Sequence, residues 1–119
     1  MKENITATKA VAFAIKIVHL YKDLVNEQKE YVLSKQLLRS GTAIGALIRE
    51  AEQAESKADF LHKMNTALKE ANETGYWLFL LHEGKWLTNE QFGLFNNGCV
   101  EIVKLLASTV KTTKANLAK

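Results

Sequence analysis

The residues best suited to metal binding or catalysis are the carboxylates and histidines in the third quarter of the chain. Asp59 and His62 form one Asp-x-x-His pair, and Glu70 and Glu73 follow about three helical turns later. A di-metal site in a four-helix bundle needs Glu-x-x-His on two helices and a glutamate from each of two others. The sequence contains no second copy of the pair. We therefore expect no metal, no cofactor and no catalytic residue, and hence no enzymatic activity.

Four basic residues have a spacing that suits phosphate binding. Lys9 and Lys16 recur with Lys2 at every seventh position, which could place them on one line along a helix. Lys35 and Arg39 are four residues apart, so they share a helix face. Cations grouped on one face can hold the phosphates of a nucleic acid. We predict that Lys9, Lys16, Lys35 and Arg39 form a nucleic-acid-binding surface.

Each of these basic residues also has a structural interpretation. Lys9 and Lys16 fit the solvated edge of a helix. Arg39 can pair with Glu73 or Glu70 and orient two helices against each other, and we favour this role for Arg39. The net charge of +3, from 16 basic and 13 acidic residues, leans towards nucleic acid without establishing it.

The composition predicts an all-α protein. The 119 residues include no proline, and aromatic residues make up only 8%. Proline typically marks turns and sheet edges, and aromatic residues are enriched in strands. Apolar periodicity predicts an up-and-down antiparallel four-helix bundle that forms a single domain over residues 1–119. The predicted helices span residues 8–26, 33–54, 57–82 and 89–113.

Capping signals fix several of these helix ends. Thr6 or Thr8 can cap the first helix. Gly84 is expected to end the third helix, because glycine is common just past a helix end. Thr88 and Gln91 form a capping box at the start of the fourth.

Small residues indicate where two helices pack closely. Gly41 and Gly45 lie on one face of the second predicted helix, where glycine would otherwise cost about 1 kcal/mol relative to alanine. If the second and third helices form a hairpin, Gly41 lies opposite Ala71 and Gly45 opposite Ala67. The same register places Arg39 opposite Glu73. We predict a tightly packed hairpin in which these four small residues line the helix contact.

A run of six apolar residues at 76–81 exceeds what one helix of a small bundle can bury. An exposed apolar patch of this kind usually marks an interface. We predict a homo-oligomer whose interface contains four residues of this run: Tyr76, Trp77, Phe79 and Leu80. The first helix likewise carries two apolar stripes, one of which includes Val11 and Ile15.

The single cysteine and the absence of long apolar segments bear on location. Cys99 cannot form an intrachain disulfide, which fits a reducing compartment, and its place in an apolar stripe favours a core residue over a nucleophile. Lys9, Lys16 and His19 interrupt the apolar run of the first helix well before the roughly 20 residues that a membrane span needs. We expect a cytoplasmic protein without membrane contact.

Three segments resemble a known bacterial family: IVHLYKDL, EYVLSKQLLRSGTAIGALIREA and DFLHKMNTALKEANETGYWLFLL. They are similar to the four-helix bundle proteins of the large-subunit ribosomal RNA intervening-sequence family, once labelled a ribosomal protein. The resemblance implies an up-and-down bundle that assembles into a ring-like homopentamer, with no known catalysis. A related branch includes the accessory variability protein of diversity-generating retroelements, which associates with a reverse transcriptase and nucleic acid. The chain departs from the family pattern at Leu47 and Arg49.

Two functions follow as hypotheses. The first is a non-enzymatic oligomeric scaffold that binds RNA or DNA through its basic residues, repeated around the ring. The second is a protein-interaction adaptor, such as an accessory subunit of a reverse transcriptase.

Overall fold

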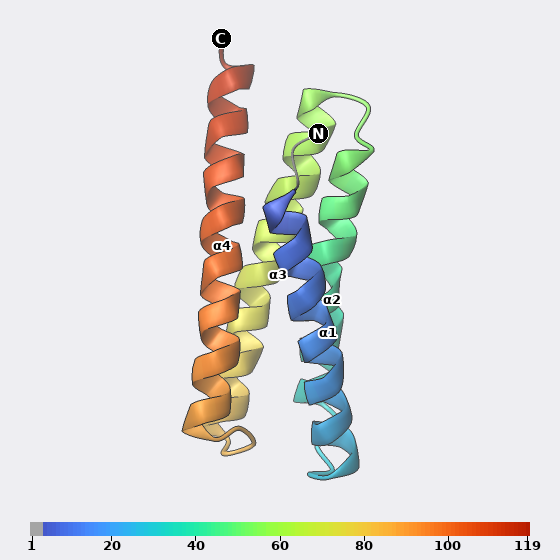
Figure 1. Cartoon of the computed structure of the whole chain (residues 1–119), viewed down its shortest axis with the longest axis vertical. Coiled ribbons are helices and arrows are strands. Elements are labelled where there is room, and N and C mark those ends of the chain that lie inside the picture. Colours follow the sequence, from blue (N-terminus) through green and yellow to red (C-terminus); the bar gives the residue numbers. More distant parts are fainter. Residues whose placement is uncertain (1–3) are drawn as a thin grey trace.

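The computed structural model describes residues 4–119, and these residues form four α-helices and no strand. The helices are α1 (Ile5–Asn26), α2 (Leu33–Glu52), α3 (Lys57–Glu83) and α4 (Asn89–Leu117). Each helix packs against the next along the chain, and α4 returns to a sparser contact with α1 (Figure 1). The result is an up-and-down bundle of 50 × 25 × 21 Å, so the predicted all-α four-helix architecture is confirmed.

Several helix ends differ by one to four residues from the predicted bounds. Helix α1 begins at Ile5 instead of residue 8, because the Asn4 side chain accepts a hydrogen bond from the Ala7 amide at 3.0 Å. Helix α2 ends at Glu52 instead of residue 54, and α3 ends at Glu83, one residue late. Helix α4 continues to Leu117, four residues beyond the predicted 113.

The connection between α3 and α4 contains both of the helix-end signals predicted there. Thr88 and Gln91 form the predicted capping box, with both reciprocal hydrogen bonds at 3.0 Å. Gly84 does end α3, but it has φ −78°, a value open to any residue. The left-handed conformation falls on Lys85 instead, with φ 67°.

Helix α2 receives its N-terminal cap from the buried side chain of Glu30. This carboxylate accepts hydrogen bonds from the amides of Ser34 (2.7 Å), Leu33 (3.0 Å) and Val32 (3.2 Å). Burial by itself would raise the pKa of Glu30, but these hydrogen bonds outweigh it and the pKa lies below its ordinary value. The charged carboxylate therefore stabilises the start of α2.

The close helix contact at the two glycines involves α1, which corrects the predicted packing against Ala67 and Ala71. A Cβ atom at Gly41 would lie 3.0 Å from Cγ2 of Ile17, and one at Gly45 would lie 3.8 Å from the backbone of Ala10. Because Gly41 and Gly45 carry no side chain, α1 can approach the backbone of α2 closely at these two positions.

The α2–α3 hairpin is instead fixed by a polar link in its centre. The hydroxyl of Thr74 lies 3.0 Å from that of Ser40, and both residues are fully buried. Each hydroxyl also donates to a carbonyl one turn earlier in its own helix or lies within hydrogen-bond distance of it, so both buried hydroxyls have partners. Ala67 and Ala71 are fully buried core residues of α3. The thiol of Cys99 on α4 donates a hydrogen bond to the backbone carbonyl of Ala71.

We expect Glu30→Gln to lower the free energy of unfolding by about 1–2 kcal/mol at neutral pH, because charge-assisted hydrogen bonds at the start of α2 are weakened. A lowered folded-state pKa means that the stabilisation is complete above the ordinary glutamate pKa of about 4.3 and is lost as the pH falls through the folded-state value. Urea unfolding at neutral and at acidic pH measures this difference.

Glu27→Gln is the matched control, because Glu27 is exposed in the same connection. A loss of stability in Glu30→Gln that stays constant down to acidic pH would show that the charge of Glu30 contributes nothing.

Candidate interaction surfaces

Arg39 is held in an ion-pair network between α2 and α3. Its guanidinium donates to Glu70, with Nη1 3.2 Å from Oε1, and Nη2 pairs with Glu73. The same Glu73 carboxylate accepts a hydrogen bond from the indole of Trp77 at 2.9 Å. The preferred structural interpretation of Arg39 is thus confirmed. With two carboxylates beside it, Arg39 is a poor candidate for binding phosphate.

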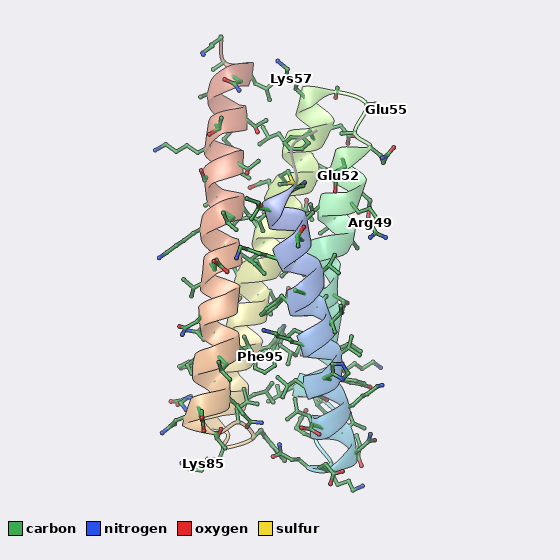
Figure 2. All side chains as sticks on the ribbon, in the orientation of Figure 1. Arg49, Glu52, Glu55, Lys57, Lys85 and Phe95 are labelled. Atoms are coloured by element: carbon green, nitrogen blue, oxygen red, sulfur yellow. The ribbon has the colours of Figure 1, made fainter. Side chains whose placement is uncertain are left out.

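Lys9 and Lys16 line a groove between α1 and α4. Nζ of Lys9 lies 3.2 Å from a carboxylate oxygen of Glu101 on α4. Lys16 makes no ion pair with any residue in the range 4–119. The groove has a volume of about 340 Å³, and Phe13 and Phe95 meet edge to face at its floor. Figure 2 shows Phe95 between the ribbons of α4 and α1.

The four basic residues selected from the sequence do not form one surface. Helix contacts run from α1 to α2, α3, α4 and back to α1, so the α1–α4 groove and the α2–α3 contact lie on opposite sides of the bundle. Lys9 and Lys16 belong to the first side and Arg39 to the second. Lys35 is exposed near the start of α2 and has no ion pair among the described residues. Lys2 lies outside the described residues.

The apolar run of α3 divides between the core and the surface. Leu78 and Leu81 are fully buried, whereas Tyr76 and Phe79 keep 54% and 49% of their surface exposed. Trp77 and Leu80 are half-buried. Of the four residues predicted for a self-association interface, two are therefore freely accessible to a partner.

A second exposed apolar pair lies on α1 and was not selected from the sequence. Val11 and Ile15 are 43% and 54% exposed and border a groove of about 750 Å³ between α1 and α2. Their presence in an apolar stripe separate from the core stripe was the available signal. The apolar pattern shows that α1 has two stripes, but it does not show which of the two faces the bundle and which faces solvent.

The carboxylates, histidines and cysteine considered for chemistry form no metal-binding cluster in the part of the chain that the structure describes. Within residues 4–119, no three His, Cys, Asp or Glu side chains are close enough to hold a metal ion. Asp59 accepts a hydrogen bond from the amide of Glu55, while His62 is exposed. Burial raises the pKa of the Cys99 thiol to about 11, so this thiol stays protonated at neutral pH and is inert as a nucleophile. In the same part of the chain, no helix has an apolar stretch long enough to cross a membrane.

Comparison with known proteins identifies the family. The model of the 23S rRNA-intervening sequence proteins matches residues 2–108. The chain belongs to this family. No protein of curated function matches it significantly.

A solved structure from the same group closely resembles the bundle. It is a protein of unknown function from the S23 ribosomal protein family of Bacteroides thetaiotaomicron VPI-5482. It is 61% identical, covers 90% of this chain and 99% of its own, and superimposes with a TM-score of 0.89. The family and the fold of this chain are therefore established.

We expect a double-mutant cycle on Arg39→Gln and Glu73→Gln to give a coupling energy of about 0.5–1 kcal/mol in the free energy of unfolding, because the pair is only partly exposed and belongs to a network. Lys35→Gln combined with Glu73→Gln is the control and should show no coupling. Strict additivity for Arg39 and Glu73 would contradict a structural role for Arg39.

Proposed function

We propose that this protein is a non-enzymatic scaffold that assembles from several copies of itself and binds nucleic acid. The ring-like homopentamer implied by the family resemblance is the assembly that we propose. The proposal has two parts: an apolar interface between copies, and cationic side chains that the assembly repeats.

The exposed aromatic pair on α3 carries the proposal. Fully burying a large apolar side chain is worth about 1.5–3 kcal/mol, and Tyr76 and Phe79 are already about half covered, so covering the rest of both supplies about 1.5–3 kcal/mol in total. Leu78 and Leu81 in the same run already fill the core side of α3. Tyr76 and Phe79 lie on the other side of the helix, where they face solvent. A second copy of the chain would cover it.

The second apolar pair determines what kind of contact can form. Helices α1 and α3 lie diagonally across the bundle and are not neighbours around it. Val11 and Ile15 border the groove between α1 and α2, so they form a patch separate from that of Tyr76 and Phe79 on α3. When two unlike patches pair with each other, the contact is head-to-tail, and repeated contacts close into a ring if the rotation allows it.

The nucleic-acid part of the proposal is supported by cations without internal partners. Lys16 and Lys35 form no ion pair within the described residues. Lys9 forms one ion pair, with Glu101. A ring repeats each cation in every copy, and the affinity for nucleic acid grows with the number of phosphates neutralised.

Mixing two interface variants tests the assembly. Light scattering should show an oligomer for the wild type and monomers for Ile15→Glu and for Phe79→Glu. Either substitution would place an unpaired carboxylate in the apolar contact, which opposes association. Each variant keeps one intact patch, so their mixture should form a dimer and nothing larger. A monomeric wild type at high concentration, or variants that still assemble, would overturn the head-to-tail interface.

Binding of labelled RNA and DNA oligonucleotides tests the second part. Affinity should fall steeply from about 50 to 200 mM salt, and Lys16→Gln with Lys35→Gln should reduce the salt slope by about one unit for each lysine that contacts phosphate. Lys69→Gln, an exposed lysine on α3, is the control. An intact oligomer that binds neither polymer would exclude the nucleic-acid scaffold and favour an adaptor for a protein partner.

A further inference from the structure

The C-terminal part of α4 carries all of the net positive charge of the protein. Residues 102–119 contain four lysines and no acidic residue. The preceding 101 residues hold 12 basic and 13 acidic residues, which is a net charge of −1 against +3 for the whole chain. Residues 4–22 and 31–49 each hold three basic residues and no acidic one, and residues 102–119, with four, have the largest excess of this kind.

Three of these lysines form a stripe along the outer side of α4. Lys104, Lys111 and Lys114 are separated by seven and three residues, a spacing that keeps them within one side of an α-helix. The inward side of the same segment is occupied by Ile102, Leu106 and Val110, all buried. At a rise of 1.5 Å per residue the stripe is about 15 Å long, which corresponds to about four phosphates of one strand of a duplex.

The nearest acidic residue along α4, Glu101, lies one turn before Lys104 and pairs with Lys9 on α1. None of the lysines of the stripe forms an ion pair with another residue of the range 4–119. Like charges three residues apart destabilise a helix slightly, and here no acidic neighbour offsets the cost. Figure 1 shows that the last turns of α4 extend past the start of α1, so this part of α4 is open to a large ligand. The arrangement suits an external polyanion.

We propose that the lysine stripe of α4 is the main phosphate-binding element of this protein and that its ligand is the backbone of a nucleic acid. The inference rests on the proposed function. It assigns phosphate binding to lysines other than Lys9, Lys16 and Lys35. Lys111, Lys114 and Lys119 lie past residue 108, where the family match ends, so the family pattern does not account for them. The stripe contacts phosphates without reading bases, and binding is therefore independent of sequence.

The test compares two variants of equal charge. Lys104→Gln, Lys111→Gln and Lys114→Gln together remove the stripe, while Lys22→Gln, Lys57→Gln and Lys69→Gln remove three exposed lysines elsewhere. If the stripe neutralises three phosphates, raising salt from about 50 to 200 mM weakens duplex binding about 40-fold more for the wild type than for the stripe variant. The control variant should keep nearly the wild-type slope. Circular dichroism and light scattering confirm that both variants fold and assemble.

The outcomes separate this inference from the function on which it rests. Binding by the wild type with an unchanged slope in the stripe variant would overturn the stripe and leave the scaffold intact. No binding to any nucleic acid would overturn both. Vesicles containing phosphatidylglycerol provide a further probe: if the stripe variant loses vesicle binding while the wild type ignores nucleic acid, the ligand is a lipid surface and the proposal is wrong.

Discussion

The close approach of α1 to α2 determines the shape of this bundle. Gly41 leaves room for Ile17, and Gly45 lies against the backbone of Ala10, so α1 sits deep against α2. The same placement leaves α1 in only sparse contact with α4, and the groove over Phe13 and Phe95 marks that looser side. An asymmetric bundle results, with three close helix contacts and one open one. This asymmetry gives the protein distinct faces on which different contacts can be made.

Polar groups inside the bundle determine how its helices are aligned. The Ser40–Thr74 link and the pairing of Arg39 with Glu70 and Glu73 all join α2 to α3. A shift of either helix by one turn would separate the two buried hydroxyls and the ion pairs together. Apolar packing supplies most of the stability of such a bundle, and these polar contacts select one register among several of similar apolar burial.

Sequence reasoning succeeded where neighbours in the chain are neighbours in space. The short connection between α2 and α3 fixes their antiparallel register, so the pairing of Arg39 with Glu73 was predictable. Gly41 and Gly45 were correctly recognised as a close-packing face, but spacing cannot tell which helix fills it, since Ala10 offers the same small surface as Ala67 or Ala71. Selecting cations by local spacing likewise did not include the α4 lysines that we propose as a phosphate-binding stripe, because they were noticed only from the charge balance of the whole chain.

Cys99 adds a property that does not depend on any ligand. Its thiol lies 3.2 Å from the carbonyl of Ala71 and is only 2% exposed, enclosed between α4 and α3. An alkylating reagent can reach the sulfur only when these two helices separate. The rate of labelling would therefore report how often the bundle opens at this contact, from a reporter group that the chain already contains.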